Sequence, residues 1–194
     1  MPKPLFLWDI DDVLNDLVFC CCQNQAQRLK PGVRFDEIHA NPPLEEFGCS
    51  LEEYMALLDE CRKEHLYSRP PVKEVLEFFN EYGHRFHSMT LSSAPMDLAP
   101  QSAEWVLRHF GKWIQGTLFV PSPRKHIPSG SVLFASKAEA VVKLNGILID
   151  DMPINVESVR RAGGRALYFP APWNENAGMK VETFLHSLLE FCEN

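Results

Sequence analysis

A short apolar run that ends in a string of carboxylates constrains this chain more than any other feature. Residues 4–8 read Pro-Leu-Phe-Leu-Trp, and Asp9, Asp11 and Asp12 follow directly. A continuous apolar run is typical of a strand buried on both faces of a parallel sheet. Carboxylates held together at the end of such a strand raise one another's pKa and require a cation or a proton. The sequence therefore predicts a parallel sheet with an acidic site at the carboxyl edge of its first strand.

Strand-like and helix-like segments alternate along the rest of the chain. Later apolar segments predict strands at residues 85–91, 116–120, 146–149 and 165–169. Helices are expected between them, at residues 72–82, 102–110 and 155–162, and from a capping box made by Ser136 and Glu139 to about Gly146. This alternation predicts an α/β fold with a parallel sheet, helices on both faces and a ligand site at the carboxyl ends of the strands.

The interval between the first and second predicted strands is too long for this alternation. Most of it has helical character, and Ser50 with Glu53 forms a second capping box. The helix that starts there is expected to reach about residue 67, before Arg69-Pro70-Pro71 breaks it. We therefore expect residues 17–70 to form a small helical cap, inserted into a core made of residues 1–16 and 71–194.

A second pair of carboxylates, Asp150 and Asp151, follows the predicted strand at residues 146–149. Helix caps or surface turns would explain either acidic cluster alone, but they account poorly for both together. The carboxyl ends of two strands in one parallel sheet lie at the same edge, so the two clusters would meet. A pocket of carboxylate oxygens is suited to Mg²⁺.

Four short motifs follow one another in a characteristic order. They are Leu7-Trp8-Asp9-Ile10-Asp11-Asp12-Val13-Leu14, then Met89-Thr90-Leu91-Ser92-Ser93-Ala94-Pro95, then Lys137, and last Ile147-Leu148-Ile149-Asp150-Asp151. Together they resemble the haloacid dehalogenase-like (HAD) hydrolase superfamily, of the type with a helical C1 cap. The resemblance spans residues 5–174 apart from the cap. It implies a Rossmann-like core with the strand order 5-4-1-2-3.

The resemblance also implies a role for each matched residue. Asp9 would be the catalytic nucleophile and Asp11 the catalytic acid and base. Mg²⁺ would be held by Asp9, by the backbone carbonyl of Asp11, and by Asp150 or Asp151. The phosphate would be bound by Ser92, Ser93 and Lys137, with Thr90 as the rival residue of the second motif. Asp12 stands where many members of the family have Gly; it is taken as a tolerated departure without a catalytic role, and a helix cap is the alternative.

These roles imply a Mg²⁺-dependent phosphohydrolase that acts on a small phosphorylated metabolite through an aspartyl phosphate. The true dehalogenases of the family lack a carboxylate equivalent to Asp11, so its presence favours phosphoryl transfer. Two alternatives remain, a protein phosphatase of the same superfamily and a non-catalytic binding or regulatory module with this fold. Similarity around Ser92-Ser93-Ala94-Pro95 and Pro172-Trp173-Asn174 to the 5'(3')-deoxyribonucleotidase branch suggests a nucleoside monophosphate as the substrate.

Several side chains of the cap and of one long loop are candidates for substrate contacts. An aromatic ring of the cap could stack on a base, although each of these rings is also a candidate for the core: Phe19, Phe35 and Phe47. Basic residues of the cap could contact an anionic substrate or form a solvated face: Arg28, Lys30 and Arg34. A loop is expected at residues 120–136, with its basic residues in solvent: Arg124, Lys125 and His126.

Composition excludes several other classes of protein. The 26 acidic and 19 basic side chains leave a formal net charge of −7, which argues against binding to a nucleic-acid polymer. No apolar run is long enough to span a membrane. The six cysteines have no metal-binding or disulfide spacing, so we expect reduced thiols in a cytoplasmic monomer or homodimer. Of the adjacent residues Cys20, Cys21 and Cys22, we expect most to be buried and one thiol to be exposed.

Overall fold

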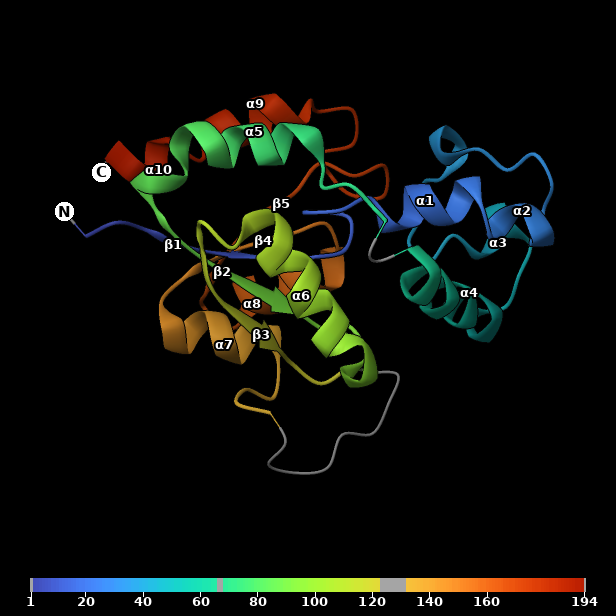
Figure 1. The fold of residues 1–194 in the computed structure, drawn as a ribbon, viewed down its shortest axis with the longest axis horizontal. Helices are drawn as coiled ribbons and strands as arrows, with labels where there is room; N and C mark the ends of the chain where they lie inside the picture. The colour runs from blue at the N-terminus through green and yellow to red at the C-terminus, as the bar shows by residue number, and fades with distance from the viewer. Residues whose placement is uncertain (1, 66–67, 123–131, 194) are drawn as a thin grey trace.

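The computed structural model describes residues 2–65, 68–122 and 132–193. Five parallel strands form one sheet (Figure 1): β1 (Leu5–Trp8), β2 (His87–Ser92), β3 (Ile114–Phe119), β4 (Ile147–Asp150) and β5 (Arg165–Tyr168). Their order across the sheet is β3-β2-β1-β4-β5, which confirms the predicted order 5-4-1-2-3 read from the other edge. The basic residues Arg124, Lys125 and His126 lie outside the described residues.

Helices cover both faces of the sheet, and Figure 1 shows the sheet between these two layers. Phe6 and Trp8 of β1 face the first layer, which is formed by α5 (Lys73–Tyr82), α6 (Ala99–Phe110) and α9 (Val181–Ser187). Leu7 faces the second layer, formed by α7 (Lys137–Leu144) and α8 (Pro153–Arg161). A last short helix, α10, spans Glu190–Glu193. Side chains of β1 thus alternate between two apolar cores, which explains why its sequence is apolar throughout.

The predicted helix ends need several corrections, among them that of α8, which begins at Pro153 instead of at residue 155. Helix α6 begins at Ala99 instead of at residue 102, because Pro100 fits the first turn, where its missing N–H is not needed. Helix α7 ends at Leu144, and its C-cap is Asn145, which adopts the left-handed conformation (φ 51°), instead of Gly146. Gly146 is required for a different reason, because a Cβ atom there would lie 2.8 Å from a methyl group of Leu7. The capping serine of α7 is confirmed, since the Ser136 hydroxyl accepts the backbone N–H of Glu139 (3.1 Å).

The long interval after β1 folds into short helices around an apolar cluster of their own, to one side of the sheet in Figure 1. These elements are α1 (Leu17–Gln23), α2 (Ala26–Leu29), the 3₁₀ turn Phe35–Glu37, α3 (Leu44–Phe47) and α4 (Leu51–His65). The capping box of α4 is confirmed: the Glu53 N–H donates to the Ser50 hydroxyl (3.2 Å), and the Glu53 carboxylate accepts the Ser50 N–H (2.8 Å). Among the described residues, no helix is long and apolar enough to cross a membrane.

The register of the sheet brings the acidic motifs together. Trp8 pairs with Thr90 of β2 and with Ile149 of β4, so the residues that follow β1 and β4 leave the sheet at the same edge. The N–H of Asp9 extends this pairing by donating to the carbonyl of Ile149 (2.9 Å). The carboxyl edge of the sheet therefore places Asp9 beside Asp150, as the sequence predicts.

Candidate active site

A buried lysine joins the two acidic motifs. The ammonium Nζ of Lys137, the first residue of α7, lies 2.9 Å from Oδ2 of Asp9 and 2.6 Å from Oδ2 of Asp150. The Lys137 side chain is 4% exposed, and that of Asp150 is fully buried. Burial alone would lower the pKa of Lys137, but the charges of Asp150 and Asp9 outweigh it and raise the pKa. Lys137 is therefore a fixed positive charge at the carboxyl edge of the sheet.

Three buried carboxylates surround this single ammonium group. Oxygen atoms of Asp9, Asp150 and Asp151 lie within 4.8 Å of one another, and Oδ1 of Asp9 has no hydrogen-bond partner. Burial raises the pKa of Asp9 to about 7, with the charges of Asp150 and Asp11 adding to the effect and Lys137 opposing it. Burial also raises the pKa of Asp151 well above its ordinary value. The cluster carries more negative charge than Lys137 can neutralise, and its donor set, all oxygen, fits Mg²⁺.

Asp150 and Asp151 have different surroundings. Both oxygens of Asp150 are occupied, because Oδ1 accepts the N–H of Met152 (2.9 Å) and the Asn155 amide (3.0 Å), while Oδ2 faces Lys137. Asp151 is held from the other side by Trp173, whose indole N–H donates to Oδ2 (2.9 Å). Asp150 therefore orients Lys137. In Asp151 the Trp173 contact uses Oδ2 and leaves the second carboxylate oxygen, Oδ1, for another ligand.

Asp11 faces a cation from the long insertion. Arg62 of α4 donates through Nε to Oδ2 of Asp11 (2.9 Å), and the amide of Asn15 donates to Oδ1 (3.2 Å). Burial opposes ionisation of Asp11, but the charges of Arg62 and Arg69 outweigh burial and hold the pKa of Asp11 below its ordinary value. Asp11 is therefore an anion in this arrangement.

Asp12 also lines the cavity, but its carboxylate has a structural contact. It has positive φ (59°), and its Oδ1 accepts the backbone N–H of Val18 in the first turn of α1 (2.8 Å). The contact satisfies one N–H of the first turn, while the N-cap position of α1 is Asp16.

The two candidates of the second motif have different surroundings at the end of β2. Ser92 and Ser93 line a cavity of about 330 Å³ together with Asp9, Asp11 and Lys137. Thr90 lies two residues earlier, is fully buried, and has a hydroxyl without a hydrogen-bond partner. The Ser92 hydroxyl accepts the N–H of Ala94 (3.1 Å), a contact that orients it at the strand end. Ser92 and Ser93 therefore lie where a group bound at Asp9 would meet them, and Thr90 does not.

Solved structures share this architecture over nearly the whole chain. A predicted phosphatase from Clostridium acetobutylicum is 16% identical, with 98% of this chain and 100% of that chain covered and a TM-score of 0.55. A HAD-superfamily hydrolase from Ehrlichia chaffeensis is 10% identical, with 98% of each chain covered and a TM-score of 0.59. The chain has the haloacid dehalogenase-like (HAD-like) fold.

The same HAD-like fold carries more than one reaction. A 2-haloacid dehalogenase from Pseudomonas syringae pv. tomato is 17% identical to this chain, with 98% of this chain and 100% of that chain covered and a TM-score of 0.50. No protein-family model and no curated protein sequence matches the chain. At these identities the likeness establishes the fold, so the reaction has to follow from the chemistry of the site.

The insertion in this HAD-like chain supplies one wall of the cavity. Side chains of α4 at intervals of four residues, Tyr54, Leu58 and Arg62, line it together with Met55, Asn41 and Pro42. The Tyr54 hydroxyl donates to the amide oxygen of Asn41 (2.7 Å), which fixes both groups. The spacing of four along α4 was the signal in the sequence that could have identified Arg62 as a residue of the site.

The rings and basic residues of the insertion that the sequence left open between substrate contact and core or solvent do not line the described cavity beside Asp9. Phe47 is fully buried against Tyr54, while Phe19 and Phe35 stack edge to face and lie at a separate cavity. Arg28 and Arg34 are exposed and pair with Glu60 and Asp36, and Lys30 is exposed as well. Phe47 belongs to the apolar cluster and Phe35 packs against it, whereas Phe19 is 41% exposed. Tyr54 is the aromatic ring that the described cavity lining contains.

Sequence reasoning also missed the groups that orient the carboxylates. Asn155 of α8 donates to Asp150, and Trp173 reaches Asp151 from the segment after β5. Asn155 follows the acidic pair closely, so a first-turn contact could have been foreseen. Trp173 gave no such signal, because its contact depends on how the chain returns after β5.

Proposed function

We propose that this chain is a Mg²⁺-dependent phosphohydrolase that acts on a small phosphorylated molecule through an aspartyl phosphate on Asp9. The observation that carries the proposal is the position of Lys137, which holds one oxygen of Asp9 at 2.9 Å while the other oxygen has no partner. A buried carboxylate with one fixed and one free oxygen is suited to act as a nucleophile. Ser92 and Ser93 lie across the same cavity, where they would donate to phosphoryl oxygens.

In the first step, Oδ1 of Asp9 attacks phosphorus in line with the leaving group. The bond between phosphorus and the leaving oxygen breaks as the Asp9–phosphorus bond forms. Lys137 neutralises negative charge on Asp9 and on the phosphoryl oxygens, and its position is fixed by Asp150. Water then attacks phosphorus, phosphate is released, and Asp9 returns to a free carboxylate.

Mg²⁺ would be held by Asp9, by the backbone carbonyl of Asp11 and by Asp151. Asp151 is preferred over Asp150, because the oxygens of Asp150 already accept hydrogen bonds from Met152, Asn155 and Lys137. When bound, the ion supplies the positive charge that lets an anionic phosphate approach an anionic nucleophile.

Asp11 would move the protons of the reaction. It would protonate the leaving oxygen in the first step and accept a proton from the attacking water in the second. With its Arg62 contact intact Asp11 is an anion, which suits the second role. The first role requires Arg62 to move away from Asp11, so that the carboxyl group can carry a proton.

The carboxylate at Asp11 and the size of the cavity narrow the reaction and the substrate. A dehalogenase has no leaving oxygen to protonate, so the second carboxylate favours phosphate esters. We take residues 17–70 as the cap over this site, because Tyr54, Leu58 and Arg62 line a cavity of about 330 Å³. Such a covered cavity favours small molecules over folded phosphoproteins. Nucleoside monophosphates remain one candidate class, with Tyr54 as the available ring.

The test is phosphate release from a panel of nucleoside monophosphates, sugar phosphates and an aryl phosphate, with Mg²⁺ or EDTA. We expect turnover that requires Mg²⁺ and is lost in Asp9→Asn. The matched control is Asp36→Asn, which changes an exposed carboxylate paired with Arg34 and should leave turnover unchanged. Turnover that survives EDTA or Asp9→Asn contradicts the mechanism. Turnover of phosphopeptides above all members of the panel contradicts the small substrate.

A further inference from the structure

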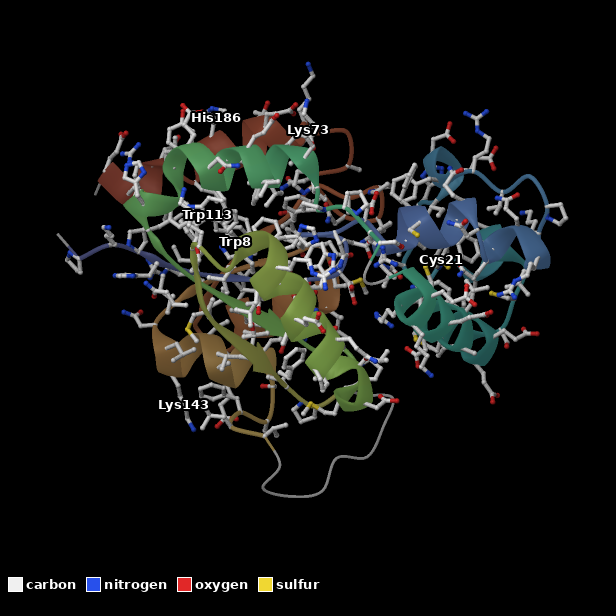
Figure 2. All side chains as sticks on the ribbon, viewed as in Figure 1. Trp8, Cys21, Lys73, Trp113, Lys143 and His186 are labelled. Carbon is white, nitrogen blue, oxygen red and sulfur yellow. The ribbon has the colours of Figure 1, made fainter. Side chains whose placement is uncertain are left out.

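We propose that Cys61 and Cys21 form a redox-active pair, in which Cys61 is the nucleophilic thiolate that a hydroperoxide oxidises and Cys21 is the thiol that closes the disulfide. The pair lies in the apolar cluster between α1 and α4, where Figure 2 shows Cys21. The proposal does not depend on the phosphohydrolase activity proposed above.

The first observation is a buried guanidinium without a carboxylate partner. Arg69 is 3% exposed, and its Nη2 lies 3.4 Å from both the carbonyl oxygen and the Sγ atom of Cys61. Its Nη1 lies 3.5 Å from the amide oxygen of Asn15, and its Nε has no hydrogen-bond partner. Within residues 2–65, 68–122 and 132–193, no carboxylate forms an ion pair with Arg69.

A buried positive charge that cannot lose its proton needs an anion nearby. Asp11, Asp12 and Asp16 act on Arg69 only through longer-range attraction. Two of the groups that interact with Arg69 at hydrogen-bond range are thiols that can become anions, Cys61 at 3.4 Å and Cys20, and of these two only Cys61 has its pKa lowered. Arg69 therefore stabilises the thiolate form of Cys61.

The second observation is the neighbouring thiol. Cys21 and Cys61 are both fully buried, and the thiol of Cys21 donates a hydrogen bond toward the sulfur of Cys61. This hydrogen bond and the charge of Arg69 lower the pKa of Cys61 against the effect of burial, and Arg62 acts in the same direction. The same hydrogen bond and burial raise the pKa of Cys21. These opposite shifts favour the thiolate form at Cys61 and the thiol form at Cys21, the arrangement that thiol oxidation needs.

Neither thiol of the pair is exposed, so a hydroperoxide would have to reach Cys61 past Cys20, which is half-buried and also interacts with Cys61. Oxidation would begin when the Cys61 thiolate attacks one oxygen of a hydroperoxide, ROOH, and breaks the O–O bond. The products are the sulfenic acid of Cys61 and an alkoxide that takes up a proton to become ROH. The Cys21 sulfur then attacks the sulfenic sulfur, water leaves, and a Cys21–Cys61 disulfide remains.

The disulfide would tie together two walls of the described cavity. Leu17 and Val18 of α1 line it on one side, and Tyr54 and Leu58 of α4 line it on the other. It would also remove the thiolate that balances Arg69. Oxidation would therefore restrict the movement of α1 relative to α4, and it would leave the positive charge of Arg69 without the Cys61 thiolate.

The test is to treat the reduced full-length chain with hydrogen peroxide and to follow each cysteine by mass spectrometry. We expect a loss of two hydrogen masses and a peptide pair linked through Cys21 and Cys61. In Cys21→Ala, the sulfenic acid should persist at Cys61 and be trapped by dimedone. In Cys61→Ala, peroxide consumption should fall by about tenfold or more, because an ordinary thiol is only a few per cent ionised at neutral pH.

Cys49→Ala is the matched control, because Cys49 lies in the same insertion, has no guanidinium contact in the described structure, and has a pKa raised by burial and by Glu53. This variant should consume peroxide as fast as the unmodified chain. Mapping the unmodified chain tests the proposal even if the buried variants fail to fold. A link between Cys20 and Cys61, or oxidation that begins at Cys49 or Cys192, would overturn it.

Discussion

Replacing Lys137 by methionine removes the ammonium group that contacts Asp9 and Asp150, while the shape of the side chain is nearly kept. Lys137 contacts Asp9 at 2.9 Å and Asp150 at 2.6 Å, and its side chain is 4% exposed. Removing one partner of a buried ion pair costs about 3–5 kcal/mol, because the other charge stays buried without compensation. For a chain of this length that corresponds to a fall in Tm of about 6–20 °C.

The stability lost in Lys137→Met should depend on pH, and the pKa of Asp9 sets the direction of this dependence. Without Lys137, the pKa of Asp9 rises further above its ordinary value of 3.8, so the folded variant binds protons that the unfolded chain does not bind. A state that binds more protons gains stability as the pH falls. The deficit of Lys137→Met relative to the unmodified chain should therefore be large at about pH 8 and smaller at about pH 5.5.

The assay is thermal unfolding by circular dichroism in EDTA at both pH values. The control is Lys143→Met, on the same helix, because Lys143 points to solvent in Figure 2 and its contact with Glu139 is exposed. We expect no change in Tm for the control. An equal deficit at both pH values, or a deficit no larger than that of the control, refutes the reasoning about the buried cluster.

Three further predictions concern the same site. Trp173→Phe removes the N–H that Asp151 accepts but keeps an apolar ring, so Mg²⁺ affinity measured by calorimetry should fall about tenfold or more; an unchanged affinity would exclude Asp151 as a ligand that Trp173 positions. Arg62→Met removes the charge that holds the pKa of Asp11 low, so the acid limb of the pH–rate profile should move to higher pH, and an unmoved limb argues against Asp11 as the titrating group. Burial raises the pKa of Asp9 from 3.8 to about 7, so the free energy of unfolding of the metal-free chain should fall as the pH rises between these two values. Denaturant unfolding in EDTA at several pH values measures this dependence. A free energy of unfolding that rises with pH in that range contradicts the raised pKa of Asp9.

Features that depend on neighbours in the sequence were predictable. The capping boxes at Ser50 and Ser136 follow from contacts three residues apart, which the helical backbone itself positions. The acidic ends of β1 and β4 meet because parallel strands leave a sheet at a common edge, whatever surrounds them. The meeting of Asp9 with Asp150 was therefore predictable before any side-chain position was known.

Contacts between elements that are distant in the sequence were not predictable in the same way. Arg62 reaches Asp11 across 51 residues, and Trp173 reaches Asp151 across 22. An apolar pattern says which face of a helix is buried, but the rotation and position of that helix against another element depend on packing of the whole insertion.

The sequence by itself determined the layered α/β core and the acidic edge, because local hydrogen bonds and burial on both faces of the strands fix these, while the strand order followed from the resemblance to the HAD superfamily. Only the tertiary structure decided which carboxylates Lys137 holds, which cap residue faces Asp11, and that Arg69 lies against a cysteine. These pairings depend on distances between side chains of separate elements. Such distances depend on how the helices and strands pack against one another, and the spacing of residues along the chain does not determine that packing.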